Sequence, residues 1–122
     1  MQDEINRWQY LSEEAKAGRL YVDADVAKQC RAALDRQIEL YGDVRNNLAE
    51  LSRVSGLGDF AEGLALARLL GLKAVDPAGD GDLDTALKDH IQVLGLIGET
   101  IQVSLDRLLE QDSSNAQDLD KV

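Results

Sequence analysis

The sequence predicts an all-α protein, and three observations support that fold class. Hydrophobic residues make up 44% of the 122 residues but aromatic residues only 4%, a balance typical of helices packed by aliphatic side chains rather than of sheets. The chain contains a single proline, so long helices can form without interruption. Apolar residues also recur every three, four or seven positions, as they do on the buried faces of packed helices.

The charge of the chain restricts the partners that it can have. Asp and Glu number 23 against 13 Lys and Arg, which gives a net charge of −10. This surface repels a phosphate backbone, so we expect no nucleic-acid partner.

No run approaches the roughly 18 apolar residues of a membrane span, and the N-terminus lacks the basic start of a Sec signal peptide. The composition therefore predicts a cytoplasmic protein without a membrane span.

The first 20 residues are expected to form a separate N-terminal amphipathic segment. Apolar residues recur there at spacings of three and four between Asp3 and Lys16, and Gly18 ends the pattern. Trp8 lies on the apolar face of this stretch. Its ring either anchors a partner or packs on its own domain, and the sequence leaves both alternatives open.

The first long helix opens the main domain, which we expect to be a helical hairpin over residues 21–111. Asp23 or Asp25 can cap it, and it runs to about Arg53. Its apolar positions follow a seven-residue repeat, which is typical of helices that pack against other helices. Cys30, the single cysteine, excludes an intramolecular disulfide and is placed in this repeat as a small core residue. The residues of this helix predicted to contact a partner are Leu34, Tyr41, Val44, Leu48 and Leu51.

A short, strongly apolar middle helix is predicted after the first long one. Gly56 and Gly58 form a turn with Phe60, and Asp59 can cap the helix that follows. Gly71 is expected to end this helix.

The second long helix begins at Leu83, after a cap at Asp80 or Asp82, and ends at about Gln111. The segment 112–122 is too polar to bury a face, so we expect a disordered acidic tail. The seven-residue repeat of this helix contributes the other predicted partner contacts, which are Leu87, Leu94, Ile97, Ile101 and Leu108.

Residues 93–98 of the second long helix read Val-Leu-Gly-Leu-Ile-Gly and are apolar nearly all round. One neighbouring helix cannot cover such a girdle. It must meet the middle helix, a second chain or both, and we favour both.

The acidic loop before the second long helix resembles a calcium-binding loop only in part. Asp76, Asp80 and Asp84 fall at the first, fifth and ninth ligand positions of an EF-hand loop. Ala78 and Leu87 occupy the third and twelfth positions, where oxygen ligands are needed. A turn with a helix cap is the favoured interpretation, and calcium binding is the alternative.

No arrangement of residues predicts an enzyme. His90, the single histidine, lacks a positioned partner, because Asp89 points to a different helix face. We interpret His90 as a partly hydrated residue at the edge of the packed face. No catalytic residue, metal site, cofactor or small-molecule substrate is predicted.

Two long helices with a seven-residue repeat, the turn Gly56-Leu57-Gly58-Asp59-Phe60 and the string Asp89-His-Ile near the start of the second long helix carry a family resemblance. The chain resembles the Trp-x-Gly-type, ESAT-like proteins of actinobacterial type VII secretion. That resemblance implies a helical hairpin that pairs into an antiparallel four-helix bundle. It covers about residues 23–111.

The sequence departs from the family pattern at two places. Gly56 stands where the family's turn has Trp, and the string Tyr21-Val-Asp-Ala-Asp25 precedes the first long helix, whereas the family's Tyr-x-x-x-Asp/Glu export signal follows the hairpin. The resemblance therefore implies a divergent member, either cytoplasmic or exported by a type VII system, or a partner that is not exported.

Together these observations predict a non-enzymatic protein that pairs through apolar helix faces, as a homodimer or as a heterodimer with a related hairpin. The alternative is a cytoplasmic adaptor, chaperone or regulatory module that docks a partner helix.

Overall fold

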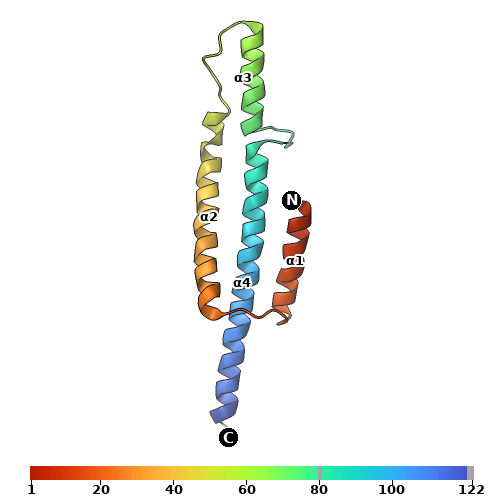
Figure 1. Ribbon diagram of the computed structural model, residues 1–122, viewed down its shortest axis with the longest axis vertical. Coiled ribbons are helices and arrows are strands. Elements are labelled where there is room, and N and C mark those ends of the chain that lie inside the picture. Colours follow the sequence, from red (N-terminus) through yellow and green to blue (C-terminus); the bar gives the residue numbers. More distant parts are fainter. Residues whose placement is uncertain (80, 121–122) are drawn as a thin grey trace. The chain divides into compact units, whose positions relative to one another are not determined.

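The computed structural model describes residues 1–79 and 81–120, and all regular secondary structure in these residues is helical (Figure 1). The predicted all-α class is therefore confirmed. The four helices are α1 (Gln2–Lys16), α2 (Ala24–Leu51), α3 (Ala61–Ala74) and α4 (Leu83–Asp120).

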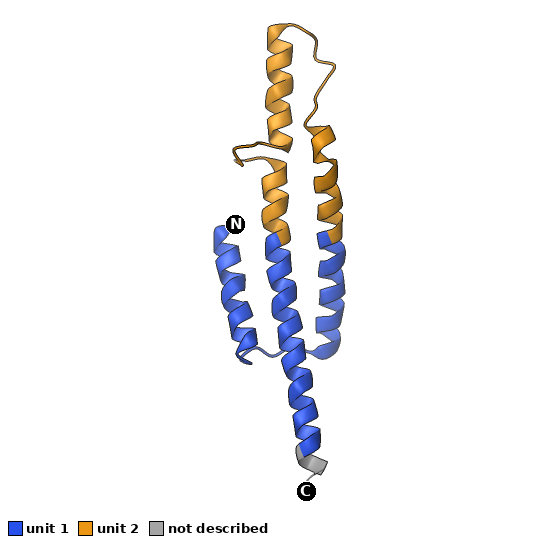
Figure 2. Ribbon diagram, turned by 180° about the vertical axis from the view of Figure 1, so that it is seen from behind, with its two compact units in different colours: residues 1–38, 92–122 blue, residues 39–91 orange. Residues whose placement is uncertain are grey.

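The chain divides into two compact units (Figure 2). Unit 1 contains residues 1–38 and the described residues from 92 onward, and unit 2 contains residues 39–91. These units do not coincide with the segments 1–20 and 21–111 expected from the sequence, because α1 packs on α4 within unit 1.

In unit 1, α1 is fastened to α4 by polar contacts at its C-terminal end. The Lys16 ammonium lies 3.1 Å from a carboxylate oxygen of Glu99. The Arg107 guanidinium donates a hydrogen bond to the backbone carbonyl of Lys16. Small side chains let the helices of this unit approach closely. Its buried residues include Ile5, Ser12, Ala15, Ala27, Thr100, Ser104 and Leu105.

The apolar girdle of residues 93–98 belongs to unit 1, and α1 packs beside it. Leu96 lines a hollow together with residues of α1 from Gln9 to Lys16. The middle helix, one of the two expected neighbours, belongs to unit 2. Periodicity shows that a face is apolar, but it does not identify the segment that covers the face.

In unit 2, the second half of α2 packs on the first turns of α4. The Arg45 guanidinium donates a 2.8 Å hydrogen bond to Asp84, and this bond raises the pKa of Arg45. The rings of Tyr41 and His90 meet edge to face, with their centres 6.3 Å apart. His90 itself is exposed, which agrees with its predicted place at the edge of a packed face.

Aspartates cap both long helices, as the sequence predicts. A carboxylate oxygen of Asp23 accepts a 3.0 Å hydrogen bond from the backbone N–H of Val26, so Asp23 rather than Asp25 is the cap of α2. Asp82 accepts hydrogen bonds from the backbone N–H groups of Thr85, at 3.3 Å, and of Asp76, at 3.1 Å. The alternative cap of α4, Asp80, lies outside the described residues.

Replacing Asp82 with alanine is expected to lower the stability of the fold at neutral pH, because two backbone N–H groups lose their acceptor. Hydrogen bonding, chiefly from the Thr85 side chain, holds the pKa of Asp82 below its ordinary value of 3.8. Since the pKa is lower in the folded than in the unfolded protein, the stabilisation is complete above the ordinary value and is lost as the pH falls through the folded value.

The measurement is the urea midpoint of wild type and Asp82→Ala from neutral pH to about pH 2.5, below the unperturbed Asp range. We expect the difference in urea midpoint between the two proteins to become smaller at the acid end of this range. Asp82→Asn serves as the control, because its amide oxygen still accepts hydrogen bonds but carries no charge. If the difference in urea midpoint between wild type and Asp82→Ala persists undiminished in acid, the lowered pKa of Asp82 in the folded protein is contradicted.

The helix α3 departs from the prediction at both ends. Its N-cap residue is Phe60, without a side-chain cap, so the expected cap at Asp59 is wrong. The helix also continues through Gly71 to Ala74. Gly71 serves close packing rather than termination, because its backbone lies against the carbonyl of Ser52. The predicted turn is confirmed, since Gly56 and Gly58 have φ values of 88° and 96°, a region that favours glycine.

The C-terminal segment also differs from the expectation. The helix α4 continues to Asp120, so a disordered tail is wrong for residues 112–120. No glycine or proline follows Gly98, and extending an existing helix through polar residues costs little per residue. Residues 121–122 of the expected tail lie outside the described residues.

Candidate functional site

An apolar groove lies in unit 1, and it is the candidate functional site. Both α2 and α4 line it, and its volume is about 350 Å³. We call it the α2–α4 groove. Its lining residues are Cys30, Ala33, Leu34 and Gln37 of α2 with Leu94, Ile97 and Ile101 of α4.

Helical spacing places the lining residues together. Leu94, Ile97 and Ile101 follow one another at intervals of three and four, so they share one face of α4. On α2, residues 30, 33, 34 and 37 do the same. The residues of α4 that lie beside α1, among them Leu96 and Glu99, occupy a different face. The packing of α1 therefore leaves the groove open.

The groove brings together four of the ten predicted partner contacts. Leu34, Leu94, Ile97 and Ile101 line it, and each is half-buried. Cys30 also lines the groove and is exposed, so its predicted burial in the core is wrong. The seven-residue repeat places Cys30 on the correct face of α2, but no helix of unit 1 covers this part of that face among the described residues.

The chemistry of the lining suits an apolar ligand surface. No lining residue carries a formal charge, and Gln37 is the one amide among them. Fully burying a large aliphatic side chain stabilises by about 1.5–3 kcal/mol, and the leucines and isoleucines of the groove have realised only part of that. A helix with an apolar face can provide the remainder, because side chains at intervals of three and four fit between two neighbouring helices.

The other predicted partner contacts do not reach this groove. Tyr41 and Val44 are half-buried in unit 2, and Leu51 is exposed. Leu48 and Leu87 are buried within unit 2, at 1% and 8% exposure. Their assignment to a partner surface is therefore wrong, because they are already buried within the chain.

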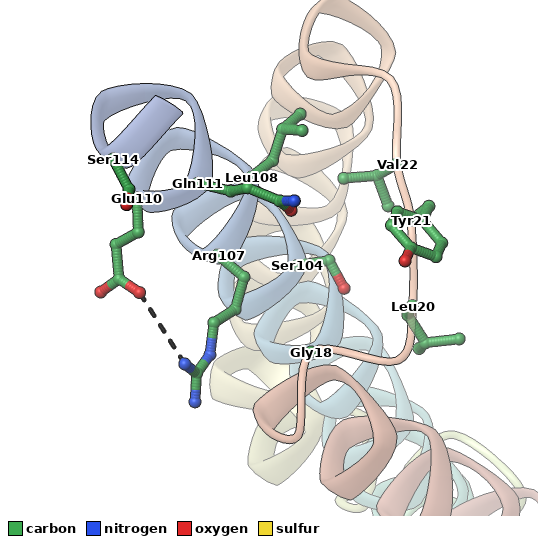
Figure 3. A pocket seen from close by; sticks show the side chains of 10 residues that line it. All are labelled: Gly18, Leu20, Tyr21, Val22, Ser104, Arg107, Leu108, Glu110, Gln111 and Ser114. Atoms are coloured by element: carbon green, nitrogen blue, oxygen red, sulfur yellow. Dashed lines mark ion pairs between the residues drawn. The ribbon is translucent and has the colours of Figure 1, made fainter. Parts of the chain in front are cut away.

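Leu108 lines a second hollow of unit 1, which the sequence did not predict (Figure 3). In this hollow the Ser104 side chain points toward the segment that carries Leu20, Tyr21 and Val22. Its hydroxyl has no hydrogen-bond partner among the described residues. The side walls come from the irregular segment after α1, which has no periodicity to reveal them. The lining residues are Gly18, Leu20, Tyr21, Val22, Ser104, Arg107, Leu108, Glu110, Gln111 and Ser114.

This second hollow does not present a free charge. The Arg107 guanidinium lies 3.8 Å from Glu110 and also donates to the Lys16 carbonyl. A cation that is paired in this way is a poor anchor for an anionic ligand. The α2–α4 groove, which has no charged lining residue, is therefore the candidate surface of unit 1 for an apolar partner.

The acidic loop before α4 uses its carboxylates for local structure. Asp76 accepts a 2.9 Å hydrogen bond from the backbone N–H of Ala78, and Asp84 pairs with Arg45. The remaining ligand of the calcium alternative, Asp80, lies outside the described residues. Among the side chains that the structure describes, in residues 1–79 and 81–117, no group of three or more His, Cys, Asp or Glu is placed to hold a metal ion.

Sequence reasoning also missed a second apolar surface, on α3 in unit 2. Phe60, Leu64, Leu66, Leu69 and Leu70 are all exposed. The signal was present in the sequence, because leucines occur on several sides of the middle helix and one neighbour cannot cover them all.

Comparisons with known proteins do not place the chain in a family. No family model matches it, and neither curated proteins nor solved structures give a significant match. Among the residues that the structure describes, no helix combines the length and apolar character needed to cross a membrane.

Proposed function

We propose that this protein is a non-enzymatic helical-hairpin protein that acts by pairing, and that a helix of a second hairpin chain occupies the α2–α4 groove. The second chain is its own copy or a related one. The observation that carries the proposal is the groove itself, which is open, apolar and without a charged lining residue.

The packing of unit 1 explains why one added helix completes it. Three helical segments, from α1, α2 and α4, form this unit. A helix placed in the groove makes a four-helix arrangement, whose apolar residues then face a common core. The net charge of −10 keeps the outer surface of such a complex soluble.

We further propose that the pairing serves actinobacterial type VII secretion, with the protein either in the cytoplasm or exported by that system. The support is the resemblance carried by the two long helices with a seven-residue repeat and the glycine-containing turn at residues 56–60.

A cytoplasmic adaptor is the second candidate. The groove is preformed in the single chain, with Leu34 and Ile97 already half-buried, so a monomer can receive a partner helix without rearrangement. The two candidates differ in the oligomeric state of the purified chain.

Replacing Leu94 with aspartate is expected to weaken pairing by about 100-fold or more, because the partner helix would bury an unpaired charge. The molar mass measured by sedimentation equilibrium checks this. Leu109→Asp is the matched control, since Leu109 is 50% exposed on the same helix and does not line the groove.

Three outcomes are informative. An oligomer whose mass is unchanged by Leu94→Asp would refute pairing through the groove. A wild-type monomer would exclude self-pairing. If that monomer binds a related hairpin chain and Leu94→Asp abolishes the binding, the heteromeric form of the proposal holds.

A further inference from the structure

The helix α3 buries two glycines against its own chain and leaves four of its leucines exposed. Gly63 and Gly71 are buried, against the carbonyls of Leu57 and Ser52 respectively. A helix with apolar residues on several sides is normally covered on more than one of them. On α3, however, Leu64, Leu66, Leu69 and Leu70 are 56%, 50%, 61% and 45% exposed.

Four residues define one outward face of this helix. Glu62, Leu66, Leu69 and Lys73 follow one another at intervals of four, three and four, so they form a single line along the helix. All four are exposed, and helical geometry places them opposite Gly71 and about a quarter turn from Gly63. We call this line the α3 stripe.

The α3 stripe is complementary to itself. Its order is acid, leucine, leucine, base, and it is symmetric about the midpoint between residues 67 and 68. An antiparallel second copy would place Glu62 beside the partner's Lys73 and Leu66 beside the partner's Leu69. A two-fold axis would repeat both contacts, as a self-complementary interface requires.

We propose that the α3 stripe is a docking surface for a second copy of this chain, with the two α3 helices antiparallel. The charges at its ends are available, since neither Glu62 nor Lys73 forms an ion pair among the described residues. These two charges also cancel within the stripe, so the acidic excess of the whole chain is not concentrated there. This surface belongs to unit 2, and the inference does not depend on the α2–α4 groove.

The ordinary role of these charges is to stabilise α3 itself. An acid in the first turn and a base in the last turn both interact favourably with the helix dipole. That role requires no particular alignment with Leu66 and Leu69. The alignment of both leucines with both charges is what a second copy would use.

The expected complex is weak. Two helices of 14 residues bury an interface at the small end of the range, below about 1,200 Å² in total. We therefore expect a dissociation constant in the micromolar range, with the leucines supplying affinity and the charges setting orientation.

Charge exchange tests the proposal. Glu62→Lys alone and Lys73→Glu alone each place like charges together twice in the dimer, and each is expected to weaken self-association by about tenfold or more. A 1:1 mixture of these two variants restores opposite charges at every contact, and so does the double variant. Sedimentation velocity on all four samples and on wild type, from about 1 to 500 μM, spans the expected range.

Arg68→Glu is the matched control, because it makes the same change of charge as Lys73→Glu at an exposed position of α3 outside the stripe. Circular dichroism checks that each variant is folded. Association through the α2–α4 groove is common to every sample, so the difference between samples reports α3 alone. Recovery of self-association in the 1:1 mixture of Glu62→Lys and Lys73→Glu establishes the antiparallel contact. A mixture that associates no more strongly than its components overturns the antiparallel contact. So does a wild type whose self-association is absent or is unchanged in the stripe variants. Either result leaves the Leu94→Asp test unaffected.

Discussion

Replacing Leu48 with alanine is expected to lower the free energy of unfolding by about 2–5 kcal/mol, the range for large-to-small substitutions in packed cores. Leu48 is 1% exposed, and it is the one large side chain of the described residues that is almost completely enclosed. Its removal leaves a cavity between α2 and its neighbours in unit 2, in addition to the lost burial. Urea denaturation followed by circular dichroism measures the loss.

Leu51 provides the matched control for this substitution. It lies one turn further along α2 and is 58% exposed. Leu51→Ala is expected to change the free energy of unfolding by about 0.5 kcal/mol or less, as at most surface positions. Equal losses for the two variants would contradict the burial that the structure assigns to Leu48.

These two leucines also show how far the seven-residue repeat could predict the site. Both belong to the apolar columns of the first long helix, and the sequence assigns both to a partner surface. In the structure Leu48 belongs to the core of unit 2, and Leu51 is exposed near the end of α2. A repeat determines the direction of a side chain from its helix axis, but the length and position of the neighbouring segments decide whether it is covered.

The starts of the two long helices and the turn between α2 and α3 were predicted by local signals. Caps at Asp23 and Asp82 and the turn at Gly56 and Gly58 follow from side-chain chemistry within a few residues. The groove was predicted only in part, because Leu34 and Ile97 are apolar members of a repeat while the open side of the groove depends on where α1 packs. That packing joins residues far apart in the sequence, so no local pattern reveals it.

Gly71 shows a role of glycine that the sequence does not reveal. Gly71 reads as a helix end, since glycine often follows the last turn of a helix. Its actual role is steric, because the backbone of α3 lies against the carbonyl of Ser52, and only a missing side chain allows that approach. Sequence alone cannot separate a glycine needed for its φ angle from one needed for its small size.

Replacing Gly71 with alanine is accordingly expected to destabilise the protein by about 1–3 kcal/mol, the usual cost of inserting a methyl group into packed structure. The added Cβ would meet the Ser52 carbonyl oxygen closer than any ordinary van der Waals contact, and a backbone atom cannot rotate away as the end of a side chain can. The methyl group therefore has to push α3 away from the end of α2. The shift in the urea midpoint measures the cost.

Gly42 provides the matched control for the Gly71→Ala substitution. It lies in α2 within the same unit, and a Cβ there would have no atom within 4 Å. Alanine is the better helix former, so Gly42→Ala is expected to raise the free energy of unfolding by about 0.5–1 kcal/mol. The same gain in propensity applies at Gly71, and only the contact with Ser52 can reverse it. If both substitutions stabilise the protein, α3 does not pack as closely as the structure places it.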